Sequence, residues 1–165
     1  MVVTGRAALL ALLLTVPVAL VARSAAVVLA FDAALLLLLV GDAWLAGSPR
    51  DLRFARDGAT STRLGEEATV GLTVRNDGSR RVRGVLRDAW APTAGVAVTR
   101  HALDVAPGRV VRMSSVLRPT RRGERRCDLV TVRSLGPLGL AGRQLSTAAP
   151  WAVRVLPGFP SRKHL

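Results

Sequence analysis

An apolar run of forty-one residues, from Ala7 to Gly47, constrains this chain more than any other feature of its sequence. It carries only three formal charges, at Arg23, Asp32 and Asp42. Runs this long and apolar are typical of membrane segments, because a helix needs about 20 residues to cross the hydrocarbon core of a bilayer. No comparable run follows, so the sequence predicts a membrane anchor joined to a single further domain.

Arg23 and Ser24 divide this run into apolar segments of sixteen and twenty-three residues. The second segment is long enough to span a bilayer, and the first is at the lower limit. The favoured interpretation is a transmembrane helical hairpin over residues 1–48, with helices at about residues 4–22 and 25–46. Two alternatives stay open: one long tilted helix that crosses once, and a cleaved export signal in place of the first helix.

The distribution of arginine predicts the orientation of the hairpin. One arginine, Arg6, precedes the first helix, and one, Arg23, lies in the turn. Four arginines follow the second helix: Arg50, Arg53, Arg56 and Arg63. Because cytoplasmic flanks of membrane helices are enriched in Arg and Lys, we predict that both termini and the second domain are cytoplasmic.

Two carboxylates lie within the second apolar segment. An ionisable side chain inside a membrane helix is costly, so Asp32 and Asp42 are candidate functional residues by default. For Asp32 the favoured interpretation is structural: a position close to the outer interface, where the side chain is protonated or bonded to a neighbouring helix. Asp42 is expected near the cytoplasmic end of its helix.

The chain after Pro49 consists of short runs with strand periodicity. The clearest runs from Glu67 to Arg75, where every second residue is apolar, and turn residues follow it from Asn76 to Ser79. Further runs occur at residues 52–55, 81–90, 96–99, 109–117, 125–133 and 151–156. About seven to eight short strands, without a long amphipathic helix, predict an all-β immunoglobulin-like sandwich over residues 49–165.

The net charge of +13, from 24 Lys and Arg against 11 Asp and Glu, bears on the choice of partner. Such an excess suits nucleic acid, anionic lipid or an acidic protein. With no Tyr, three Phe and three Trp, the chain has few aromatic side chains on which bases stack, which disfavours nucleic acid. Arginine beside an anionic membrane is the more economical explanation.

The densest basic stretch is the candidate contact for an anion or a protein partner. It comprises four arginines: Arg121, Arg122, Arg125 and Arg126. Gly123 in its centre is typical of a hairpin turn, so an exposed, solvated turn is the more economical interpretation. The oligomeric state is not predicted by this or any other feature of the sequence.

Catalytic patterns are scarce. Cys127 is the only cysteine, which excludes an intramolecular disulfide and the zinc patterns that need several cysteines. Glu66 and Glu67 are adjacent, so on a strand they point to opposite faces. We predict no catalytic residue, cofactor or metal site. An enzyme would need Cys127, His101 and one carboxylate together.

Four motifs follow one another along the chain: Gly65-Glu66 through Asn76, Arg122-Gly123, the Gly136–Leu140 turn and Val155-Leu156-Pro157. In these motifs the chain resembles the N-terminal half of a bacterial membrane family, domain-of-unknown-function family fifty-eight (DUF58). Two positions depart from the family pattern, which usually has Asp in place of Gly136 and Tyr in place of Leu156. The family's C-terminal von Willebrand A-like region is expected to be absent.

The resemblance implies a multi-pass protein of the bacterial inner membrane and a MoxR-type AAA+ ATPase as partner. Together with the residue patterns, it favours a membrane-anchored, non-enzymatic protein-interaction module. The alternatives are an outward-facing, envelope-associated β-domain and a membrane-tethered enzyme.

Overall fold

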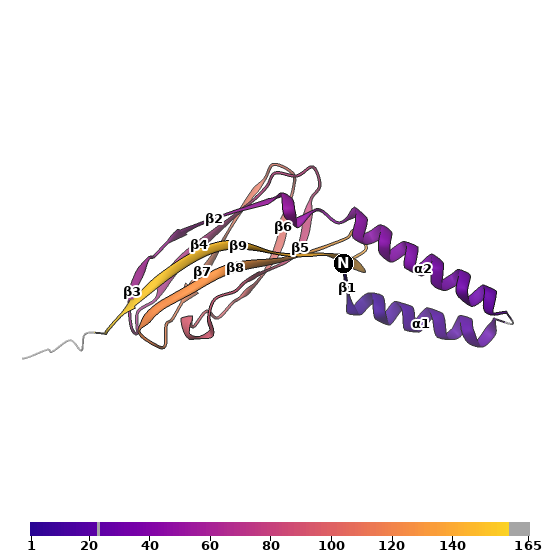
Figure 1. Cartoon of the computed structure of the whole chain (residues 1–165), viewed down its shortest axis with the longest axis horizontal. Coiled ribbons are helices and arrows are strands. Elements are labelled where there is room, and N and C mark those ends of the chain that lie inside the picture. The colour runs from indigo at the N-terminus through magenta and orange to yellow at the C-terminus, as the bar shows by residue number, and fades with distance from the viewer. Residues whose placement is uncertain (23, 159–165) are drawn as a thin grey trace, which may run out of the picture.

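The structure is a computed structural model that describes residues 1–22 and 24–158. Two antiparallel helices, α1 (Gly5–Val21) and α2 (Ala25–Leu45), project from one end of an elongated β-domain (Figure 1). The sequence predicted helices at about residues 4–22 and 25–46. Arg23, where the sequence predicts the turn, lies outside the described residues.

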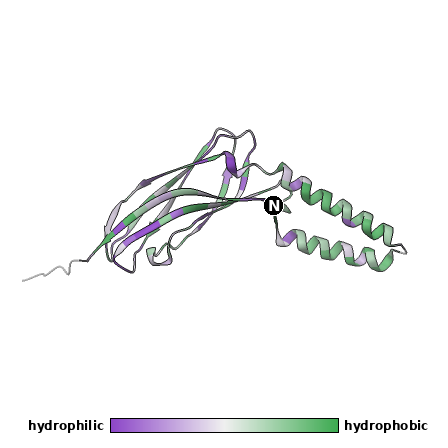
Figure 2. Ribbon diagram, in the orientation of Figure 1, coloured by the Kyte–Doolittle hydropathy of each residue, from purple (hydrophilic) through white to green (hydrophobic). Residues whose placement is uncertain are grey.

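Both helices are mostly apolar, with a few hydrophilic positions (Figure 2). Their large side chains are exposed, as Leu20 at 81% and Leu37 at 71% illustrate. Among the described residues, α2 is long and apolar enough to cross a membrane, whereas α1 is a shorter apolar helix. The apolar N-terminal helix that the sequence predicts is therefore present.

The β-domain is a sandwich of two sheets. The larger sheet has the strand order β1-β9-β8-β5-β6, and β3 also pairs with β9. Its strands are β1 (Val2–Val3), β3 (Ser61–Arg63), β5 (Val82–Asp88), β6 (Arg100–Val105), β8 (Gly123–Leu135) and β9 (Ala141–Leu156). The smaller sheet has the order β2-β4-β7, formed by β2 (Leu52–Gly58), β4 (Ala68–Asn76) and β7 (Val110–Leu117). The pairing of β3 with β9 is parallel, and the other pairings are antiparallel.

Alternating apolar side chains from both sheets form the core. On β4, the strand with the clearest periodicity, Ala68, Val70, Leu72 and Val74 are each exposed by 4% or less, so the predicted inward face is confirmed. Leu72 and Val74 pack in one cluster with residues of the larger sheet, among them Leu86, Val130 and Val132, and Ala68 and Val70 pack in a second cluster with Cys127 and Val153. The predicted all-β sandwich is therefore observed.

One predicted strand is wrong. Residues 96–99 form no strand; the 3-10 helix η2 (Pro92–Ala94) precedes them, and β6 begins only at Arg100. Gly95 has a left-handed backbone (φ +66°), and a side chain there would collide with the Arg118 carbonyl. The Thr120 N–H bonds the Thr93 carbonyl at 3.2 Å and the Arg118 N–H bonds the Gly95 carbonyl at 3.3 Å, so the chain just before residues 96–99 packs as a loop against residues 118–120.

The last strand, β9, is longer than the strand that the sequence predicts at residues 151–156. β9 begins at Ala141 and pairs with β8 along most of its length, with an irregular register between Cys127 and Leu129. Its first half contains two alanines and a glycine, residue types that are depleted in strands. The pairing with β8 decides its conformation.

Candidate functional site

A buried ion pair joins the two sheets. Arg56 of β2 and Asp88 of β5 have side chains exposed by 2% and 1%, and the Arg56 Nη2 lies 2.6 Å from the Asp88 Oδ1. The Asp88 carboxylate also accepts hydrogen bonds from Trp90 Nε1, Ser115 Oγ and Cys127 Sγ, at 2.8, 3.1 and 3.1 Å. The sequence counted Arg56 among the four arginines that follow the second helix; its guanidinium is buried and paired inside the sandwich.

The network sets the protonation of its acidic groups. Burial acts to raise the pKa of Asp88, but hydrogen bonds from Arg56, Cys127 and Trp90, with the Arg56 charge, lower it overall. Burial, followed by the hydrogen bond to Asp88, raises the pKa of the Cys127 thiol to about 12. A thiol with this pKa is protonated at neutral pH and is a poor nucleophile.

The structure does not bring His101 to Cys127. His101 lies opposite Leu86, and Leu86 lies opposite Val132, so two strand spacings and five residues separate the pair. At about 4.8 Å per strand and 3.3 Å per residue, the backbones are roughly 19 Å apart. The three-residue catalytic site that an enzyme would need is therefore not assembled.

The predicted basic contact lies at the turn between β7 and β8. Arg125, at the start of β8, donates to the Thr93 hydroxyl of η2 at 2.8 Å and to the Arg122 carbonyl at 2.6 Å, so both of its terminal nitrogens are engaged by the protein. Arg126 pairs with Glu124 at 2.9 Å, and this hydrogen bond raises the pKa of Arg126. Arg121 and Arg122 are exposed. The role of the four arginines in binding stays a prediction.

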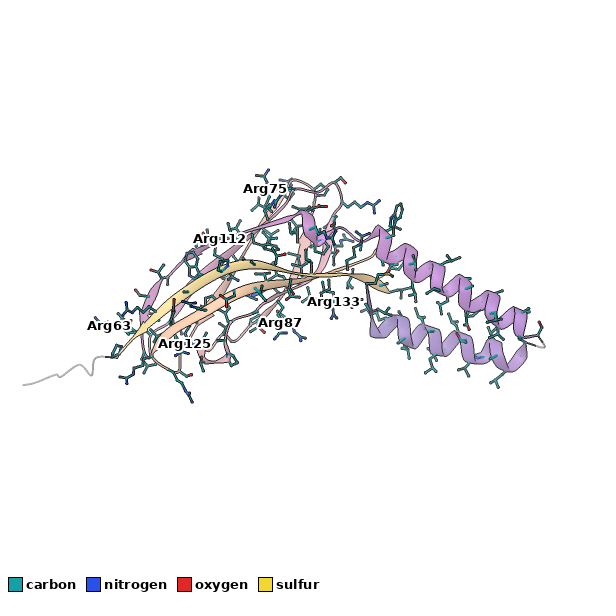
Figure 3. All side chains as sticks on the ribbon, in the orientation of Figure 1. Arg63, Arg75, Arg87, Arg112, Arg125 and Arg133 are labelled. Atoms are coloured by element: carbon teal, nitrogen blue, oxygen red, sulfur yellow. The ribbon has the colours of Figure 1, made fainter. Side chains whose placement is uncertain are left out.

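A second basic surface, which the sequence did not indicate, covers the outside of the larger sheet. We call it the outer arginine face: Arg87 on β5, Arg100 on β6 and Arg133 on β8. Together with Val85, Thr131 and Gln144, these residues line a shallow hollow of about 220 Å³. Figure 3 shows Arg87 and Arg133 along the same side of the sandwich.

The register makes this face electrostatically unbalanced. Arg87 lies directly opposite Arg100, and like charges in this position destabilise a sheet. Nearer the helical end of the same sheet, outside this face, Asp104 pairs with Arg81 and Arg83. For Arg87 and Arg100, no acidic partner is found within residues 1–22 and 24–158. The sequence carried no signal for this pairing, because the two arginines come from strands separated by a loop.

The helices are fixed to the sandwich by a second buried carboxylate. Asp42 is 2% exposed at the end of α2, and its Oδ1 accepts the Leu138 N–H at 2.8 Å. Its Oδ2 accepts the N–H groups of Leu140 and Ala141, at 2.8 and 2.9 Å. We call Asp42 and the turn at residues 136–141 the hairpin clamp. Asp42 thus binds protein backbone.

The start of α1 is held by the same turn. The Thr4 hydroxyl lies 2.9 Å from the carbonyl oxygens of both Gly139 and Leu140, to which it donates, and Val2–Val3 pairs with Gly142 and Ala141. Between the helices, the Thr15 hydroxyl donates to Asp32 at 3.0 Å, in agreement with the structural interpretation of Asp32. The helices are therefore a fixed extension of the sandwich.

No family model and no curated protein matches the chain. Among solved structures, it is similar to the CARDB domain of the PF1109 protein from Pyrococcus furiosus, crystallised in complex with di-metal ions. The identity is 17% and the TM-score 0.47, over 64% of this chain and 88% of that domain. A beta-glucosidase from Listeria innocua, in complex with isofagomine, shows 15% identity and a TM-score of 0.43, over 66% of this chain but 16% of the glucosidase.

Proposed function

We propose that this chain is a membrane-anchored, non-enzymatic protein-interaction module whose outer arginine face contacts an acidic protein surface. The observation that carries the proposal is the direct opposition of Arg87 and Arg100 over a hollow. Folding places two like charges together there at an energetic cost, and an acidic partner would remove that cost.

A binding role is favoured over catalysis by the state of the reactive groups. The Cys127 thiol is buried with a pKa raised to about 12, and its sulfur bonds Asp88 at 3.1 Å. The ion pair between Arg56 and Asp88 has its donors and acceptors occupied by the protein, so it holds the two sheets together rather than facing a substrate.

The proposed anchor is the whole helical hairpin, which crosses the bilayer twice and leaves the sandwich in the cytoplasm. Support comes from the exposed apolar side chains of both helices and from exposed Arg50, Arg53 and Arg63 after α2. The resemblance to domain-of-unknown-function family fifty-eight adds the bacterial inner membrane as location and a MoxR-type AAA+ ATPase as the partner to test. An outward-facing envelope module is the alternative.

Site-specific photo-crosslinking tests the interaction. A photo-reactive residue replaces Val85, which is 39% exposed at the centre of the hollow, and adducts are collected from membranes and with purified MoxR-type ATPase. The adduct should disappear when Arg87→Glu and Arg100→Glu are combined. The matched control combines Arg121→Glu and Arg122→Glu, which changes the net charge equally at the β7–β8 turn. Equal loss in both double variants would contradict the proposal.

A further inference from the structure

A cavity of about 330 Å³ opens where α2 meets the sandwich. Its lining includes Leu45 at the end of α2, Pro137 of the β8–β9 turn, and Arg80, Arg81 and Arg83. The cavity therefore lies between the end of an apolar helix, a basic segment and the β8–β9 turn. It is separate from the outer arginine face.

The arginines of this cavity are held in place and are incompletely neutralised. Arg80 donates to the Trp44 carbonyl at 2.7 Å, and its guanidinium carbon lies 5.1 Å from the centre of the Trp44 ring. Arg81 forms two hydrogen bonds to Asp104, and Arg83 lies 3.6 Å from the same carboxylate. Arg81 and Arg83 thus share one carboxylate, and Arg80 forms no ion pair within the described residues, which leaves donors available for an anion.

The length of α2 places the cavity at a defined depth in a bilayer. Its 21 residues, at about 1.5 Å each, match the roughly 30 Å thickness of the hydrocarbon core. Leu45 then lies at the edge of the core, and the cavity lies in the adjoining headgroup layer, which is about 5–7 Å thick. Trp44, which is 63% exposed, has the side chain most typical of this interface.

We propose that this cavity binds the phosphate of an anionic phospholipid of the anchoring bilayer. Arg80 and Arg83 donate hydrogen bonds to the phosphate oxygens, and Trp44 and Leu45 contact the apolar part of the same lipid. The inference rests on the proposed membrane anchoring and is independent of the partner of the outer arginine face.

Lipid retention tests the site. The full chain is inserted into nanodiscs of phosphatidylcholine, with or without phosphatidylglycerol, and the lipid that stays bound after extraction is identified by native mass spectrometry. Wild type should retain phosphatidylglycerol in preference to phosphatidylcholine. Each of Arg80→Gln and Arg83→Gln should lower that preference about fivefold, whereas Arg80→Lys should keep most of it.

Arg80→Gln removes a hydrogen bond to Trp44 and could loosen α2. Arg83→Gln avoids this problem, because in the described residues Arg83 pairs with Asp104 and forms no hydrogen bond to α2. The control, Arg121→Gln with Arg122→Gln, removes two charges at the β7–β8 turn and should retain the preference. Insertion without any preference, or equal loss in the control, would overturn the site alone. Displacement of the lipid by inorganic phosphate would reassign the site to a free anion, and failure to insert would overturn the anchoring as well.

Discussion

Replacing Asp42 with alanine tests whether the hairpin clamp holds the helices and the sandwich together. The carboxylate accepts three backbone N–H groups, and the bonds from Leu140 and Ala141 are buried, whereas the bond from Leu138 is part-buried. Alanine would leave two buried donors without an acceptor, at about 1–3 kcal/mol each. We expect the free energy of unfolding to fall by about 4 kcal/mol, which lowers Tm by roughly 10–20 °C.

Thermal unfolding of the detergent-solubilised chain, followed by circular dichroism, measures this change. Asp32→Ala is the matched control, because Asp32 accepts one exposed hydrogen bond from Thr15 and should cost less than about 1 kcal/mol. Amide hydrogen exchange at Leu140 and Ala141 gives the local readout. If Asp42→Ala kept the wild-type Tm, or if both amides stayed protected from exchange, the reasoning would be refuted.

Three further changes test other parts of the structure. Arg56→Met should cost about 3–5 kcal/mol, because it leaves Asp88 buried and unpaired, against less than about 1 kcal/mol for the 76%-exposed Arg53→Met. The folded-state pKa of Asp88 is lowered from 3.8, so the stabilisation by this ion pair is present above pH 3.8 and is lost as the pH falls through the folded-state pKa. Urea unfolding of wild type and variants at a series of pH values measures both the cost of the substitution and its pH dependence. Ser61→Cys, exposed on β3 at the end of the sandwich opposite the helices, should resist a membrane-impermeant maleimide in intact cells and react after permeabilisation. Gly136→Ala should lower Tm, because its Cβ would collide with the clamp carboxylate.

The labelling experiment needs the introduced cysteine because Cys127 cannot report on topology. The native thiol is fully buried and its pKa is about 12, so it should stay unlabelled on either side of a membrane. Labelling of Ser61→Cys without permeabilisation would instead support the outward-facing alternative.

The basic residues show how much of a charged surface can be predicted from neighbouring positions in the sequence. Clustering along the chain singled out Arg121, Arg122, Arg125 and Arg126, yet the guanidiniums of Arg125 and Arg126 are engaged by nearby residues. Arg87 and Arg100 are thirteen positions apart and look unremarkable in sequence, but pairing of β5 with β6 sets them face to face. The density of arginines along the sequence does not predict where positive charge gathers on a sheet, because the register of the strands decides which residues are neighbours.

The sequence by itself determined the apolar helices and the inward face of β4, because the helices follow from a long apolar run and the β4 face from alternation of apolar residues, each within one segment. Tertiary structure decided which charges are buried and what they bind. Arg56 meets Asp88 across thirty-two residues, and Asp42 meets the β8–β9 turn across almost one hundred. Periodicity tells which way a side chain points, but only the pairing and packing of distant segments tell what it contacts.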